Sequence, residues 1–227
     1  MTVRLISSKA TARLLDELAA RVEAEVRLPV SVESVGGVDA AKRVRSGEAF
    51  DIAVLASNVV DELTAEGHVV AGTRTDLVRS SIAIAVRAGT AHPDIGSAAA
   101  VRSAVMGASS VGYSTGPSGT HLQKLFAQWG IAGDVQGRLT IAPPGVPVAA
   151  LLARGDIELG FQQLSEFADV EGVEVVGMMP PEIQLVTIFS GGIAATSSRP
   201  DDARRVLAAM AGEAMAAVKR AHGMEPA

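Results

Sequence analysis

Strand-like and helix-like patterns alternate along the first 65 residues of the chain. Residues 3–6 indicate a buried strand, and the stretch 10–26 then places leucines and valines at helical spacing. The same order recurs at residues 30–34 and 38–45, and again at 50–55 and 58–66. Three such units in succession predict a parallel sheet with right-handed crossovers.

A second series of strands and helices follows. Further strands are predicted at residues 81–86, 110–113, 139–142, 156–161 and 173–176, and helices at 97–106, 120–129 and 146–153. Residues 184–195 form a long apolar segment that Gly191 and Gly192 are expected to interrupt. Two helices, over 201–210 and 213–221, are predicted to end the chain.

The pattern favours an α/β protein with two lobes. No Pro-rich, Ser-rich or charged linker separates the two series, which argues for lobes joined by more than one crossover. We expect residues 1–80 with 190–227 in one lobe and residues 81–189 in the other. Because open α/β sheets bind ligands beyond the carboxyl ends of their strands, a cleft between the lobes would collect those ends.

Composition narrows the classes of function. The chain has seven aromatic residues (five Phe, one Trp and one Tyr), which predicts an aliphatic core. A formal charge of −5 and the lack of a basic run argue against nucleic acid as a partner. The sequence has no cysteine and its four histidines show no ligand spacing, so neither a metal site nor a cofactor is expected.

Membrane insertion and export are not expected either. The longest apolar-looking uncharged run, residues 183–198, contains polar side chains and falls short of the ~20 residues that a span needs. The first residues lead directly into a strand pattern rather than a signal peptide. The expectation is a cytoplasmic protein, or a periplasmic one if the natural chain carries a signal ahead of Met1.

Four sequence blocks carry a resemblance to a known superfamily. They are residues 6–10, 50–55, 113–119 and 148–166, and the last contains the run ARGDIELG. Through these blocks nearly the whole chain resembles the type II periplasmic-binding proteins, in their molybdate-binding-protein-like branch. The resemblance implies a two-lobed α/β fold with a ligand cleft between the lobes.

The resemblance also implies an anion site. In this branch hydroxyls and backbone N–H groups at helix starts hold the ligand, which matches the physics of helix N-termini. The corresponding candidates here, with Tyr113 as part of the wall, are Ser7, Ser8, Ser34, Gly36, Gly37, Tyr113, Thr115, Pro117, Ser118, Gly119 and Thr120. Where molybdate binders tend to have a tyrosine, this chain has Gln162, which with Gln163 suits a larger ligand bearing a carboxylate.

Each of these turns also has a purely structural interpretation. Ser7 or Ser8 could cap the first helix, because serine is a preferred N-cap residue. Pro117 and Ser118 could form an ordinary helix start. The pair Gly36-Gly37 could be a flexible turn rather than a place where backbone approaches a ligand.

The same branch includes aconitate isomerase-like proteins, in which this scaffold is an enzyme. That resemblance implies the transfer of an allylic proton along a tricarboxylate, which requires one acid/base group and no metal. His121, Glu166 and Lys9 are the candidates for this group. Their structural alternatives are a surface histidine, a helix-start carboxylate and a solvated lysine.

Two other classes of function stay open. One is a non-catalytic molybdate- or sulfate-binding protein that delivers its ligand to an ABC permease. The other is the ligand-sensing domain of a LysR-type regulator, which has this fold but normally follows a DNA-binding segment. The preferred hypothesis is an isomerase acting on a small organic polycarboxylate.

Overall fold

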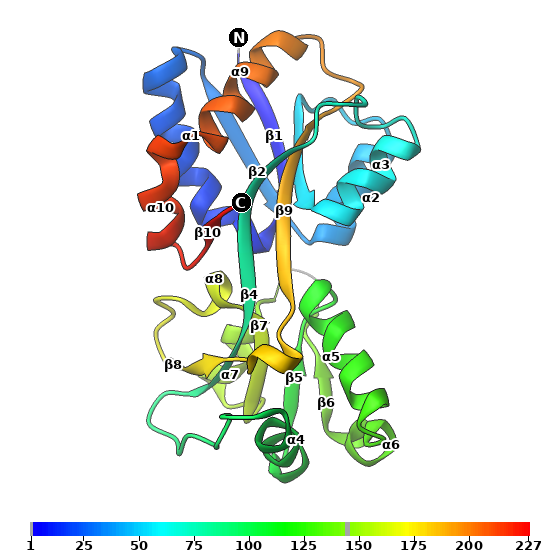
Figure 1. Ribbon diagram of the computed structural model, residues 1–227, viewed down its shortest axis with the longest axis vertical. Coiled ribbons are helices and arrows are strands. Elements are labelled where there is room, and N and C mark those ends of the chain that lie inside the picture. The colour runs from blue at the N-terminus through cyan, green and yellow to red at the C-terminus, as the bar shows by residue number, and fades with distance from the viewer. Residues whose placement is uncertain (1, 144–145) are drawn as a thin grey trace. The chain divides into compact units, whose positions relative to one another are not determined.

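The computed structural model describes residues 2–143 and 146–227 and divides the chain into two compact units (Figure 1). Unit 1 comprises Met1–Ser80 and Thr187–Ala227, and unit 2 comprises Ser81–Val186. The chain passes between the units within β4 (Thr75–Arg87) and at the start of β9 (Val186–Ile193). The sequence analysis expects the chain to return to the first lobe between residues 189 and 190, a position inside β9.

Unit 1 contains the three strand–helix repeats that the N-terminal pattern predicts. β1 lies between β2 and β3 and runs parallel to both, whereas β9 is antiparallel to β3. The short β10 pairs with β4 in the antiparallel sense. The parallel strands are β1 (Val3–Ser8), β2 (Val30–Val35) and β3 (Ile52–Ala56), and β10 is Glu225–Pro226.

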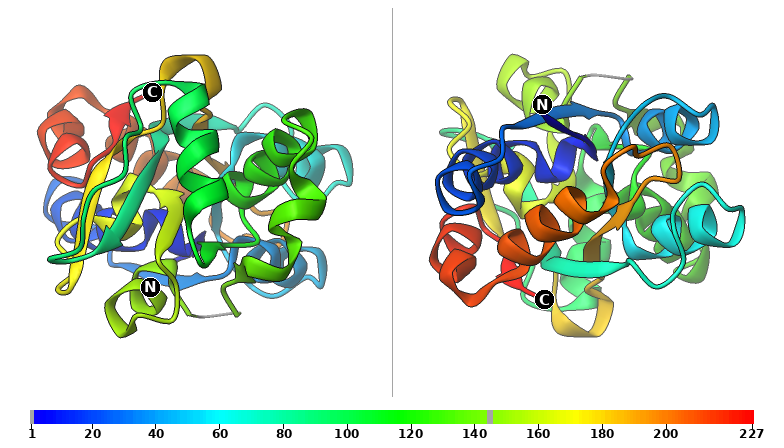
Figure 2. Two further views of the ribbon diagram at one scale, coloured as in Figure 1. Left: turned by 90° about the horizontal axis from the view of Figure 1, so that it is seen from below. Right: turned by 90° about the horizontal axis from the view of Figure 1, so that it is seen from above.

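Helices cover both faces of the unit 1 sheet (Figure 2, right). Val3 and Leu5 face α1 and α9, while Ile6, the residue after Leu5 in β1, faces the α2 and α3 side, as the period of two in a strand requires. The elements on the first face are α1 (Ala12–Val26), α9 (Pro200–Ala211) and α10 (Ala216–Ala221), and those on the second are α2 (Gly37–Arg45) and α3 (Ser57–Ala65). The 3₁₀ turns η1 (Lys9–Thr11) and η4 (Glu213–Met215) precede α1 and α10.

Unit 2 has the same layered construction. β5 runs parallel to β6 and β7, and β4 is antiparallel to both β7 and β8. The strands are β5 (Val111–Tyr113), β6 (Leu139–Ile141), β7 (Leu159–Gln163) and β8 (Val173–Met178). One face packs on α4 (Ala98–Gly107), α5 (Pro117–Gln128) and α6 (Ala132–Val135), and the other on α7 (Val148–Arg154) and α8 (Leu164–Phe167). The 3₁₀ turns η2 (Gln136–Arg138) and η3 (Pro181–Ile183) complete the unit.

One predicted detail of the C-terminal segment is wrong. β9 runs without interruption through Gly191 and Gly192. A Cβ would lie 2.2 Å from Leu207 Cδ2 at the first glycine and 2.6 Å from Val69 Cγ1 at the second, so these glycines make room for neighbouring side chains rather than a turn. The helical stretch predicted over 213–221 is present as η4 followed by α10.

The core is largely aliphatic, as predicted, but phenylalanine rings occupy its interior. Phe126, Phe161, Phe167 and Phe189 are among the largest fully buried side chains. Within the described parts of the chain, no helix has the length and apolarity needed to cross a membrane.

We expect Gly119→Ala to destabilise unit 2. A Cβ at this position would lie 1.7 Å from the backbone oxygen of Ser114, so α5 would have to move away from the end of β5. Overpacking of this kind typically costs about 1–3 kcal/mol, which urea unfolding would measure.

Gly133→Ala is the matched control, because nothing lies within 4 Å of a Cβ built on Gly133 in α6. Alanine is the better helix former, so this variant should be neutral or slightly stabilised. Equal stability of the two variants would contradict the close contact of α5 with Ser114.

Candidate functional site

In unit 1, three helical segments begin at the carboxyl ends of the parallel strands. β1 leads into η1 and α1, β2 into α2, and β3 into α3. The N-cap residues of α2 and α3, Gly36 and Ala56, make no side-chain hydrogen bond to the helix start. The first N–H groups of these two helices therefore donate no hydrogen bond to an N-cap side chain, and Asp39 is the acidic residue in the first turn of α2.

Three predicted serines lie at this edge of unit 1. The hydroxyls of Ser7 and Ser34, which are partners in neighbouring strands, are 2.7 Å apart. Ser8 is 8% exposed, and its Oγ is a buried side-chain atom without a hydrogen-bond partner among the described residues. A buried hydroxyl without a partner is costly, so a ligand that accepted its hydrogen bond would remove the cost.

Ser8 does not act as the helix cap that its sequence position allows. It stands at the N-cap of η1 in an extended conformation, and its side chain makes no capping hydrogen bond. A Cβ on Gly37 would lie 3.6 Å from the Cβ of Ser8, so the serine neighbours the start of α2. Lys9 is exposed at the start of η1.

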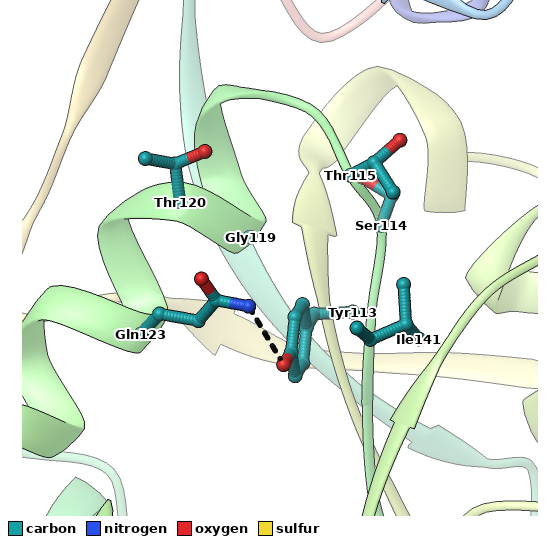
Figure 3. Close-up of a pocket in the computed structure, with 7 residues that line it drawn as sticks. All are labelled: Tyr113, Ser114, Thr115, Gly119, Thr120, Gln123 and Ile141. Atoms are coloured by element: carbon teal, nitrogen blue, oxygen red, sulfur yellow. Dashed lines mark hydrogen bonds between the residues drawn. The ribbon is translucent and has the colours of Figure 1, made fainter.

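In unit 2, a pocket of about 220 Å³ lies at the carboxyl ends of β5 and β6 (Figure 3). Tyr113 and Ile141, the last residues of these strands, are register partners and both line it. The Tyr113 hydroxyl accepts a 3.0 Å hydrogen bond from Gln123 Nε2 of α5. The full lining is Tyr113, Ser114, Thr115, Gly119, Thr120, Gln123 and Ile141.

The start of α5 forms one wall of this pocket. The helix has Gly116 as N-cap and Pro117 at its first position, and the N-cap makes no side-chain bond. Ser118 is buried (2% exposed), whereas Thr115 and Thr120 are exposed. The expected helix start is therefore present, and its hydroxyls and N–H groups lie beside the pocket residues.

Glu166 lies at the end of β7, three residues beyond the strand, in α8. Its Oε1 accepts a 2.5 Å hydrogen bond from Gln162 Nε2, and Gln162 Oε1 accepts a 3.1 Å hydrogen bond from the backbone N–H of Val148. Burial raises the pKa of Glu166 to about 7, and the hydrogen bond from Gln162 acts in the opposite direction. Near neutral pH both forms of this carboxyl are populated, so it can take up and release a proton.

The other two proton-carrier candidates have different surroundings. His121 Nε2 lies 2.8 Å from the backbone oxygen of Ile183. Because a carbonyl oxygen only accepts, this nitrogen carries a proton and ties α5 to η3. Neither His121 nor Glu166 is among the residues that line the pocket, and Lys9 belongs to unit 1.

Several residues of these sites escaped the sequence analysis. Ser114, Gln123 and Ile141 line the pocket, and Val148 bonds to Gln162. Ile141 ends β6, which runs parallel to β5, and it is the register partner of Tyr113. Knowledge of this strand pairing would have been enough to place Ile141 beside Tyr113. Within the described residues, no group of three or more His, Asp or Glu side chains is placed to hold a metal ion.

We expect the stability of the protein to depend on pH through Glu166. Its pKa in the folded protein, about 7, is above the ordinary 4.5, so the folded state binds more protons between these pH values. Stability therefore falls as pH rises through this window, and the full cost of the buried charge is present above it. Glu166→Gln should be more stable than the wild type at pH 8, by on the order of 1–3 kcal/mol, and lose this advantage near pH 4.5.

Urea unfolding of both proteins across this pH range tests the expectation. Glu171→Gln is the control, since Glu171 is exposed on the same unit. If the stability of the wild type and that of Glu166→Gln varied with pH in parallel, ionisation of Glu166 would not destabilise the folded protein, and the expectation would be wrong.

The chain is similar in sequence to a known family and to a known enzyme. The family model described as "Bacterial extracellular solute-binding protein" matches residues 3–225. An aconitate isomerase of Pseudomonas sp. is 35% identical over 185 residues, which are 81% of this chain and 70% of that protein.

Two solved structures share the fold at low sequence identity. The periplasmic molybdate-binding protein of Azotobacter vinelandii has a TM-score of 0.79 at 16% identity, covering 98% of each chain. A periplasmic thiamin binding protein has a TM-score of 0.78 at 15% identity, covering 99% of this chain and 83% of the other. Such different ligands on one fold show that the scaffold alone does not select the ligand.

The match to the family model over nearly its whole length identifies this α/β chain as a member of the bacterial extracellular solute-binding protein family, with the two-lobed fold of the type II periplasmic-binding proteins.

Proposed function

We propose that this protein is an isomerase that moves an allylic proton along a small unsaturated polycarboxylate of the aconitate type, with Glu166 as the proton carrier. The observation that carries the proposal is the carboxyl of Glu166, whose pKa of about 7 suits a group that must both accept and donate a proton. The 35% identity to an aconitate isomerase supports the same reaction class.

The reaction needs a single group that exchanges one proton with carbon. The base takes a proton from the carbon next to the alkene, and the electron pair of the broken C–H bond spreads through the double bond toward a carboxylate. The base exchanges its proton with solvent and then protonates the far alkene carbon, and the double bond has then moved. The step is neutral in redox terms, and a base within about 3 Å of the carbon is sufficient.

The negative charge that develops on the substrate needs hydrogen-bond donors. In unit 2 these are the hydroxyls of Thr115 and Thr120 and the N–H groups at the start of α5. In unit 1 the buried hydroxyl of Ser8 and the uncapped start of α2 form a donor set of their own. Donors of this kind favour carboxylates and contribute to stabilising an enolate-like transition state.

The test of catalysis is proton NMR of trans-aconitate with the enzyme in D₂O. The wild type should form cis-aconitate with deuterium incorporated at carbon, and kcat/KM should rise with pH around 7 as Glu166 ionises. Glu166→Gln should lower the rate by about 10²–10⁴ while trans-aconitate still binds, because only the proton carrier is lost.

Glu171→Gln, with its exposed side chain, should keep the wild-type rate and serves as the control. If the wild type produced neither cis-aconitate nor deuterium exchange after prolonged incubation, the aconitate proposal would fail. Unchanged turnover in Glu166→Gln would remove Glu166 from the mechanism.

The alternative function is a non-catalytic oxyanion-binding protein that works with an ABC permease. The orphaned hydroxyl of Ser8 beside an uncapped helix start favours this alternative as well, because such a pair suits any oxyanion. A thermal-shift comparison of ligands separates the two functions.

We expect trans-aconitate and other di- or tricarboxylates to raise Tm more than molybdate or sulfate. A ligand at 100 times its Kd stabilises the folded state by about 2.7 kcal/mol. For a chain of this size that corresponds to a rise of several degrees, on the order of 2–4 °C for each kcal/mol. A clear shift with molybdate and none with the carboxylates would favour the transport function.

A further inference from the structure

Gln162 is a polar side chain in an apolar layer of unit 2. It is 2% exposed, and its register partner Ala83 belongs to the cluster that also contains Val148 and Leu152 of α7. A buried amide is costly unless its donor and acceptor ends are both bonded. Here both ends are bonded, to Val148 N and to Glu166 Oε1.

The two partners decide which way the amide of Gln162 points. The backbone N–H of Val148 can only donate, so the atom that faces it must be Oε1. The nitrogen then faces Glu166, and no exchange of the two amide atoms satisfies both contacts. With Oε1 held by the start of α7, Gln162 presents a donor, not an acceptor, to the carboxyl of Glu166.

We propose that Gln162 is a positioning residue for the reaction: anchored on Val148 N, it holds Oε1 of Glu166 and leaves the proton to be exchanged at Oε2. This inference rests on the proposed function, since it concerns the same proton carrier. It assigns Gln162 to the orientation of the base, where the sequence analysis assigned it to direct contact with a ligand.

Among the described residues of α7, β7 and β8, the charged side chains have other partners. β7 and β8 are the strands in contact with α8; β7 has no titratable residue, and Glu174 of β8 faces His92 and Gly89 N. Arg154 of α7 pairs with Asp156. The pKa of Glu166 responds first to burial and then to the hydrogen bond from Gln162, which favours the ionised form.

The sharpest test is Gln162→Glu. This variant has the same length and keeps an acceptor for Val148 N, but it replaces the donor to Glu166 by a second carboxyl. Two carboxyls in contact share one proton, so the pKa of the pair rises. Titration of ¹³C-labelled glutamate carboxyls by NMR, assigned with Glu166→Gln, should show the Glu166 midpoint at least about one pH unit higher.

Activity provides the second measurement. In Gln162→Glu, kcat/KM for trans-aconitate should fall about tenfold or more at pH 6 and recover as the pH rises, because one pH unit on the ionisation is a factor of ten. Gln162→Met, which lacks both the donor and the acceptor, should also raise the NMR midpoint. Gln136→Glu adds the same charge at an exposed position of unit 2 and should change neither quantity.

The outcomes separate this inference from the proposed function. A raised midpoint with no isomerase activity even in the wild type would sustain the positioning of Glu166 by Gln162 and overturn the reaction. A Glu166 midpoint that stays unchanged in both folded Gln162 variants would overturn the positioning. So would a loss of kcat/KM that is equal at every pH, since a purely structural defect gives that result.

Discussion

The need to satisfy polar groups buried at the carboxyl ends of parallel strands governs this structure. In each unit the helices begin where these strands stop, so backbone N–H groups and side-chain hydroxyls gather at one edge of the sheet. Some of these groups find partners within the chain, as Ser7 does with Ser34 and Gln162 does with Val148. The hydroxyl of Ser8 has no partner among the described residues, and a bound solute could supply one.

The two units differ in what they bring to this common arrangement. Unit 1 offers uncharged hydroxyls and helix starts, which can hold an anion but cannot exchange a proton with carbon. Unit 2 adds Glu166, whose burial brings its pKa close to the pH of the cell interior or periplasm. The proposed acid/base chemistry therefore rests on one partly buried carboxyl of unit 2.

The local parts of the structure could be predicted from the sequence, but the partners could not. Periodicity and turn residues place the strand–helix repeats, the strand end at Ser8 and the helix start near Gly119. The pairing of Gln162 with Val148 joins two residues 14 positions apart through a tertiary contact, and the pKa of Glu166 depends on how much water reaches it. Neither this contact nor this pKa can be inferred from residue spacing or composition.

The glycine pair in β9 also constrains how this chain can vary. Leu207 from α9 takes the space on one side of the strand at Gly191, and Val69 takes it on the other side at Gly192. Each glycine and its facing side chain therefore share a single volume. A larger residue at Gly191 becomes acceptable when Leu207 is replaced by a smaller one. In related chains these two positions should therefore covary, so that one of them is small whenever the other is large.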